Sequence, residues 1–394
     1  MFFEVLIFLL FGTALGVLFG IAPGIHPNFI ILLVPLLLTL NAPVLALLAM
    51  IVSMAVVNVL VDFIPSILLG APDPDAALSV LPGHRMLMSG EGYAAIKLAV
   101  MGGLGAILVC IALLPLIILT VPVIYQAATP VMAFILMGFV GIMLFFSKKR
   151  VLSLICFLLA GVIGILSFRL PIDNFLILFP IFSGFFALPV LLIQMKNRAV
   201  VPKQNVSRST IEARKIAKPV MFGSLGGIVS GLLPGVGSSE IAGLATIDKN
   251  DRSFLITQGA ITTANVLLSF LALWLIGHPR SGVALAVKQF MGIGASEFLF
   301  IVVIAVISAA IGVLLTLFLA KRIIRVIEKI DYSLISKIIF SLIVILAFYF
   351  TGLAGLFLAG LCCALGMVVN LANIKRGLLM GVLILPTILF YLGV

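Results

Sequence analysis

Three polar side chains recur every four residues inside an otherwise apolar run. Asn58, Asp62 and Ser66 have this spacing, which puts them on one face of a helix. A carboxylate inside a membrane span costs several kcal/mol unless it faces a polar interior. Asp62 is therefore predicted to take up a proton or to help bind sodium. The competing interpretation is a carboxylate that is only hydrogen-bonded between helices.

A second polar face occurs far downstream in the chain. Thr262, Asn265 and Ser269 follow the i, i+3, i+7 pattern of one helix face. If this helix packs beside the one that carries Asp62, the two faces line a polar cleft. Asn58 and Asn265 are then placed to orient a bound solute.

Each polar helix is preceded by an apolar segment that a Pro-Gly pair interrupts, at Pro23-Gly24 and at Pro234-Gly235. Proline removes a backbone donor and frees carbonyl groups, so such a break within a membrane is tolerated only inside protein or beside a wet cavity. A helix that restarts after the break presents free N–H groups and partial positive charge, which suit a carboxylate or phosphate. A single break indicates only a kink, whereas two at corresponding places favour a binding site.

Several side chains just past the breaks are candidates for that site. Ser238 and Ser239 are suited to capping the restarted helix and orienting an anion. His26 and Glu240 are the ionisable residues there, and Glu240 joins Asp62 as a candidate for ion coupling. Both could instead be solvated residues at a hairpin tip.

The elements that must position these residues are membrane-spanning helices. Of the 394 residues, 63% are hydrophobic and 9% are charged, whereas soluble domains carry about 25% charged residues. Apolar stretches of about 18 residues or more recur along the whole chain, and they lack the two-residue alternation of a membrane β-barrel. The net charge of +11 comes mostly from short loops, as the positive-inside rule expects, so we predict no nucleic-acid partner. The sequence predicts an all-α polytopic protein of the cytoplasmic membrane.

The predicted organisation is two halves joined by a basic connector. Residues 1–194 form the first half, 195–218 the cytoplasmic connector and 219–394 the second half. Each half has one broken segment, predicted to be a re-entrant hairpin, and about five spans. The broken segments are 2–40 and 220–248, and the spans are 43–70, 93–121, 124–146, 151–168, 174–194, 254–277, 297–320, 331–351, 353–373 and 377–394.

The two halves are predicted to be an inverted-topology repeat. With the basic clusters on the cytoplasmic side, the first half begins outside and the second inside. Residues 58–72 align with 265–279 at a constant offset of 207, which matches Asn, Val, Leu, Phe, Gly and Pro. Residues 20–26 align with 231–237 at an offset of 211. Two matches in the same order favour duplication over chance apolar similarity.

Other reactive side chains receive simpler interpretations. His84 and Arg85 lie in a polar stretch between spans, where a gate is one interpretation and a solvated cytoplasmic connector the other. The four cysteines fall inside apolar runs without metal-ligand spacing, so we predict no metal site, disulfide framework or cofactor. The motifs of hydrolases are absent from the sequence, so an enzyme is not predicted.

These motifs resemble the large membrane subunit of the tripartite tricarboxylate transporter family, a TctA-like permease. The resemblance lies in the first Pro-Gly motif, in residues 68–74 running into 82–86, and in residues 231–240. It implies secondary-active carboxylate uptake with a small membrane subunit and an extracytoplasmic binding protein. By analogy, the two motifs bound the substrate site with Pro23, Gly24, His26, Asn28, Pro234, Gly235, Gly237, Ser238 and Ser239. The second motif also resembles that of polyprenyl-phosphate transporters.

The sequence therefore predicts a secondary-active transporter of a small organic anion, coupled to sodium or protons. The anion is expected at the membrane midplane between the two hairpin tips. A polyprenyl-phosphate translocase is the alternative within transport, and a channel or an intramembrane enzyme is the alternative of another class. Membrane lipid is an expected partner, and a homodimer is one possible assembly.

Overall fold

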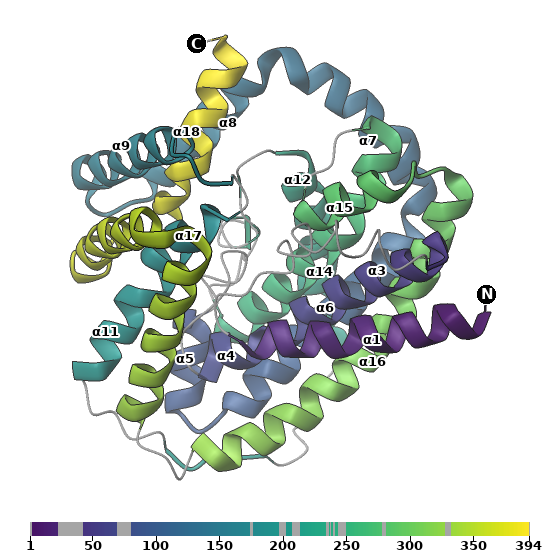
Figure 1. The fold of residues 1–394 in the computed structure, drawn as a ribbon, viewed down its shortest axis with the longest axis horizontal. Coiled ribbons are helices and arrows are strands. Elements are labelled where there is room, and N and C mark those ends of the chain that lie inside the picture. The colour runs from purple at the N-terminus through teal and green to yellow at the C-terminus, as the bar shows by residue number, and fades with distance from the viewer. Residues whose placement is uncertain are drawn as a thin grey trace.

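The protein is all-helical in the part that the structure describes, which confirms the predicted fold class. The computed structural model describes residues 2–22, 42–68, 80–173, 176–196, 202–206, 213–233, 236, 238, 241–242, 250–277, 281–327 and 332–393. Eight helical segments among these residues are long and apolar enough to cross a membrane. Figure 1 shows them as a bundle whose helices cross at varied angles.

The helices follow one another with short links. Before residue 200 they are α1 (Phe2–Ile21), α3 (Val44–Val61), α4 (Phe63–Leu68), α5 (Val80–Met88), α6 (Gly92–Ala112), α7 (Leu114–Ala128), η3 (Thr129–Val131), α8 (Met132–Phe145), α9 (Arg150–Ser167), α10 (Leu178–Phe182), η4 (Ser183–Ala187) and α11 (Leu188–Lys196). After it they are α12 (Ala213–Leu232), α14 (Asp251–Ile276), α15 (Gly282–Phe290), α16 (Ala295–Ile327), α17 (Tyr332–Leu371), η5 (Arg376–Met380) and α18 (Gly381–Leu392).

Two helix boundaries show how proline and glycine divide the apolar runs. The expected break near Pro122 is wrong, because Pro122 lies inside α7 and the chain is interrupted at Leu113 instead. Pro115 stands in the first turn of α7, where its missing N–H has no helical partner to lose. The expected division of 331–373 into two spans agrees with a kink in α17 at Gly352, whose φ of 62° is left-handed.

The buried side chains form two main cores, and both draw on helices from before and after the 195–218 stretch. We call the first core the one built by α1, α3 to α6, and α14 to α16. The second core is built by α8, α9, η4, α17, η5 and α18. In Figure 1, α1 and α3 lie on the side opposite α9, α17 and α18.

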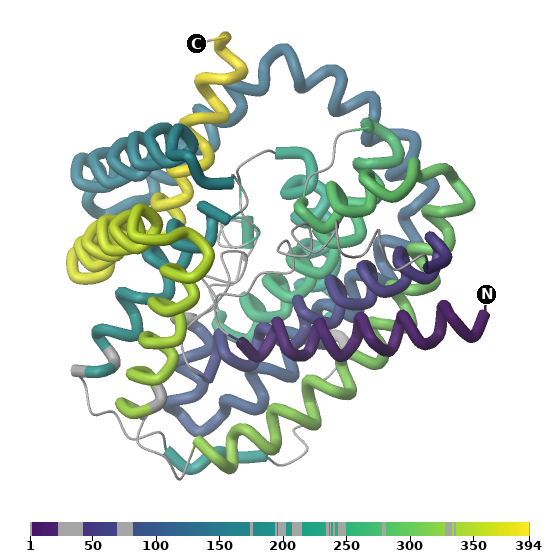
Figure 2. The backbone as a smooth tube through the Cα atoms, in the orientation of Figure 1, coloured from purple at the N-terminus to yellow at the C-terminus, as the bar shows by residue number. Residues whose placement is uncertain are grey.

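A continuous helical segment links the two cores. Ile117 and Val121 of α7 belong to the first core, whereas Met132 and Ala133 of α8 belong to the second. Figure 2 shows this segment as an arch along one edge of the molecule.

Inside the first core, helices from the two ends of the chain pack on each other through glycine. Gly102 of α6 and Gly259 of α14 approach the backbones of Ile256 and Ala99 so closely that a Cβ would overlap a carbonyl oxygen. In the same way, α16 packs on α3, where a Cβ on Gly312 would lie 2.9 Å from the Leu60 side chain. These contacts fix α3 and α14, the helices that carry the predicted polar faces, within one core.

Candidate functional site

Four of the residues predicted to bind solute or ion are described. Asn58, Asp62, Ser238 and Asn265 fall within the described part of the chain. The others lie outside the described residues, and their roles stay predictions: Pro23, Gly24, His26, Asn28, Pro234, Gly235, Gly237, Ser239 and Glu240.

The polar face of the first half is buried where the helix is interrupted. The sequence predicts one span over 43–70, and the structure divides it into α3 and α4 at Asp62. The exposed fraction is 1% for Asn58, 6% for Asp62 and 0% for Ser66. The Ser66 hydroxyl donates a hydrogen bond of 3.1 Å to Asp62 Oδ2. Asn58 has no hydrogen-bond partner for either amide atom among the described residues.

The polar face of the second half is only partly directed outward from α14. Thr262 donates a hydrogen bond of 2.6 Å to the Gln258 carbonyl in its own helix. The Ser269 hydroxyl lies 2.6 Å from that of Ser281, the N-cap of α15. Asn265 is half-buried, and its Oδ1 would lie 3.8 Å from a Cβ on Gly231 of α12. Of the three predicted residues, Asn265 is the one whose side chain lies against the helix that precedes the second break.

Asn58 has the same relation to the helix that precedes the first break. A three-glycine stripe on α1 (Gly12, Gly16 and Gly20) packs on α3, so that a Cβ on Gly20 would lie 2.9 Å from the Asn58 carbonyl oxygen. A Cβ on Gly16 would lie 2.6 Å from the Met54 carbonyl. The close approach holds α1 against α3 up to the turn just before Pro23.

The equivalent stripe on α12 packs on α14 at matching positions. Gly223, Gly227 and Gly231 follow the α1 glycines by 211 residues, and their contacts follow the α3 contacts by 207 residues. Gly12 meets Met50 and Ser53, while Gly223 meets Thr257 and Ala260. The remaining pairs agree in the same way: Gly16 meets Met54 and Val57, Gly227 meets Ile261 and Ala264, Gly20 meets Asn58 and Val61, and Gly231 meets Asn265 and Leu268.

The glycine stripes are a feature of the site that the sequence reasoning missed. Their signal was present, because a Gly-x-x-x-Gly-x-x-x-Gly spacing occurs in both halves at the offset of the Pro-Gly motifs. Small residues at this spacing let two membrane helices approach closely. The stripes position Asn58 and Asn265 beside the two breaks.

Further buried polar groups lie without partners among the described residues. Ser238, just past the second break, is 0% exposed and its hydroxyl has no hydrogen-bond partner there. The hydroxyls of Thr13, Ser230, Thr263 and Ser308 share this state. Buried polar groups are nearly always paired, so such a set indicates places for a solute, an ion or water. The four hydroxyls were not predicted, because burial cannot be read from one sequence.

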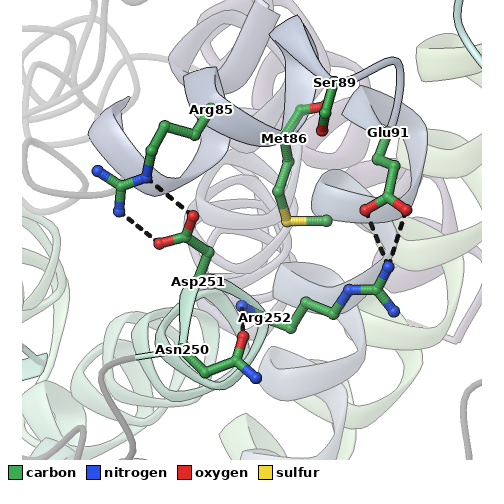
Figure 3. A pocket seen from close by; sticks show the side chains of 7 residues that line it. All are labelled: Arg85, Met86, Ser89, Glu91, Asn250, Asp251 and Arg252. Carbon is green, nitrogen blue, oxygen red and sulfur yellow. Dashed lines mark hydrogen bonds and ion pairs between the residues drawn. The ribbon is translucent and has the colours of Figure 1, made fainter.

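A polar cavity of about 560 Å³ opens where α5 and the start of α6 meet the start of α14. Figure 3 shows two ion pairs in it, Arg85 with Asp251 and Arg252 with Glu91. The hydrogen bond from Arg85 to Asp251 raises the pKa of the guanidinium. Half-exposed or exposed partners mean that each pair adds little stability.

Part of the 195–218 stretch docks beside this cavity. The Gln204 side chain accepts a hydrogen bond of 2.8 Å from Gly92 N–H and donates one of 2.9 Å to the Leu87 carbonyl. Asn205 N–H donates to the Gly90 carbonyl. His84 lies nearby on α5, and its pKa is lowered by burial and secondarily by the charge of Arg376. In the described residues, no three His, Cys, Asp or Glu side chains group as they would around a metal.

The sequence matches one known family over most of its length. Residues 6–381 match the tripartite tricarboxylate transporter TctA family. The chain is also 31% identical over 402 residues to an uncharacterized protein of Methanocaldococcus jannaschii, with 98% of this chain and 99% of that protein covered. No solved structure matches. The family match confirms the resemblance found in the motifs.

Proposed function

Because the chain belongs to the tripartite tricarboxylate transporter TctA family, we propose that it is a secondary-active transporter of a small organic anion of the carboxylate class. A sodium or proton gradient drives the uptake. The protein itself performs no catalytic step and uses no cofactor.

Family membership makes this chain a multi-pass membrane component of a tricarboxylate transporter. The tripartite family implies two partners, a small membrane subunit and an extracytoplasmic binding protein. We place the chain in the cytoplasmic membrane with its basic stretches on the cytoplasmic side, following the positive-inside rule. Membrane lipid surrounds it, and a homodimer is compatible with the fold.

The observation that carries the proposal is the matching register of the two glycine stripes. The α1–α3 pair and the α12–α14 pair make equivalent contacts at constant offsets, and each pair holds an asparagine beside a helix break. This supports an inverted-topology repeat, in which two re-entrant hairpins meet at a midplane site.

In the proposed mechanism, backbone N–H groups at the restarted helices bind the anion. Asn58, Asn265, Ser238 and Ser239 orient it, and the breaks at Pro23-Gly24 and Pro234-Gly235 shape the site with His26, Asn28 and Gly237. Asp62 and Glu240 couple the ion. The two cores move relative to each other about the anion, with the α7–α8 segment as their link.

The test is uptake by purified protein in liposomes under an imposed sodium or pH gradient. A pooled panel of radiolabelled carboxylates serves as substrate, with and without the two partner subunits. We expect gradient-dependent uptake that Asn265→Leu and Ser238→Ala each reduce at least about tenfold, the effect of losing one good hydrogen bond to a charge. A matched control is Ser224→Ala, since Ser224 is a buried serine of α12 bonded within its own helix.

The same liposomes distinguish the competing functions. Movement of a fluorescent polyprenyl phosphate without carboxylate uptake would replace the proposed substrate by a lipid phosphate. Anion flux that dissipates a gradient, and is never driven uphill by one, would indicate a channel. Uptake unchanged by both site variants would overturn the proposed site.

A further inference from the structure

We infer that the junction of α3 and α4 is a sodium site formed by the Asn58 side-chain carbonyl, the Val61 main-chain carbonyl, the Asp62 carboxylate and the Ser66 hydroxyl. This inference rests on the proposed function, because it names the ion that drives the transport. It assigns the ligands to nine consecutive residues and leaves Glu240 outside the site.

Pro65 supplies the feature that separates this junction from an ordinary helix. A helical N–H at position 65 would donate to the carbonyl of Val61, but proline has none. Ser66 N–H donates to the Asp62 carbonyl, and Asp62 N–H to that of Asn58, so both neighbouring bonds are intact. The Val61 carbonyl alone is released, in a residue that is fully buried.

The other three oxygens lie on the same face as that carbonyl. Positions 58, 61, 62 and 66 follow the i, i+3, i+4, i+8 pattern of one helix face. The Asn58 amide is 1% exposed and has no hydrogen-bond partner among the described residues. A buried amide in that state costs free energy that a bound cation would recover through Oδ1.

The chemistry of this set favours a hard cation over a proton. Carboxylate, hydroxyl and carbonyl oxygens are the ligands of hard cations, and released carbonyls coordinate sodium in transporters with broken helices. The Ser66 O–H···Oδ2 bond stabilises the charged carboxylate, which is the form that binds a cation. One carboxylate matches the charge of one monovalent ion.

The matching positions of the second half lack these features. Ser269 replaces Asp62, Ala272 replaces Pro65 and Leu273 replaces Ser66 at the offset of 207. Helix α14 continues unbroken through them to Ile276, and Ser269 is bonded to Ser281. The repeat therefore provides one such site, in the first half.

The test is the melting temperature of purified protein in detergent, titrated with NaCl at constant ionic strength against KCl and choline chloride, without any anion substrate. We expect saturable stabilisation by sodium alone. Asp62→Asn should abolish it, and Ser66→Ala should raise the sodium midpoint roughly tenfold, as changes around a bound ion do. Pro65→Ala restores the missing N–H and should also raise the midpoint, although it removes no side-chain ligand.

Ser53→Ala and Ser269→Ala are the controls, because both alter buried serines of α3 and α14 outside the site. Their sodium midpoints should equal that of the wild type. Absence of sodium-specific stabilisation in the wild type, or a midpoint insensitive to Pro65→Ala and Ser66→Ala, would overturn the site. If carboxylate uptake then follows a pH gradient, the proposed transport stands without the sodium site; sodium binding without uptake of any anion would instead refute the proposed function.

Discussion

At the scale of single residues, Asn58 is kept at a cost to stability. Both of its amide atoms are buried without a hydrogen-bond partner among the described residues, in a helix whose neighbours are apolar. A buried polar group left in this state costs about 1–3 kcal/mol. Residues that lower stability in this way are concentrated at functional sites, where a ligand supplies the missing partner.

Replacing Asn58 with leucine should therefore separate stability from transport. We expect Asn58→Leu to raise the free energy of unfolding by about 1–3 kcal/mol, because it removes an unsatisfied amide and keeps much of the volume. Carboxylate uptake should fall at least about tenfold. Chemical denaturation in detergent measures the first and liposome uptake the second. A variant that lost both stability and uptake would identify Asn58 as a packing residue.

At the scale of elements, glycine decides how closely the helices approach. The stripes of α1 and α12 face backbone, whereas Gly138 of α8 has no atom within 4 Å of the place where a Cβ would lie. The same residue type is thus essential in two helices and replaceable in a third. This difference depends on which helix packs beside which, and it cannot be read from the residue type.

Bulky substitutions in the stripes should test this. Gly16→Val and Gly227→Val should each lower the free energy of unfolding by about 1–3 kcal/mol or prevent folding, because overpacking a close contact displaces backbone. Gly138→Ala is the matched control and should behave as the wild type. Melting temperature and size-exclusion profiles make the comparison. Equal tolerance at Gly16 and Gly138 would contradict the packing described for α1 and α3.

The ion pairs of the polar cavity join α5 to α14, and their coupling should be measurable. Arg85→Glu should lower stability slightly, and Asp251→Arg in the same chain should restore it. The expected coupling energy is about 0.2–1 kcal/mol, the range of exposed ion pairs, and it should shrink in high salt. A double-mutant cycle of melting temperatures measures it. No coupling at low salt would show that the pair contributes nothing.

The sequence predicted elements better than their contacts. Apolar length located the spans, and Gly352 marked the break between two of them. Pro122 misled the prediction, because a proline within a helix and one that starts a helix read alike, whereas Pro115 was the one beside the interruption. Glu91 and Arg252 are 161 positions apart, so nothing local indicated that they pair. Asn58 and Asp62 were recognised because a polar residue in an apolar span is conspicuous. The division into halves and the roles of residues near the breaks stay predictions.

At the scale of the whole molecule, His84 and Arg376 bring charge to the region between the two cores. His84 lies on α5 of the first core, and Arg376 begins η5 of the second. The pKa of His84 is lowered from its ordinary value of 6.5 by burial and by this arginine. The folded protein therefore binds fewer protons than the unfolded chain, so its stability decreases as the pH falls below about 6.5.

Removing this histidine should reduce the sensitivity to acid. We expect His84→Gln to match the wild type in melting temperature at pH 8 and to exceed it at pH 5. His278→Gln serves as a control for the loss of an imidazole elsewhere in the chain. Melting curves between pH 5 and 8 provide the measurement. If wild type and His84→Gln lose stability in parallel, the acid response arises from other groups.

The exchange of helices between the two ends of the chain also governs how the protein can be made. Since α6 needs α14 and α3 needs α16, the N-terminal half leaves the ribosome without the surfaces that will cover it. Its glycine grooves and its buried carboxylate must wait in the bilayer, or with a chaperone, until synthesis of the remainder is nearly finished. A chain interrupted in the 195–218 stretch should for the same reason regain activity when both fragments are produced together, and neither fragment should persist in the cell alone.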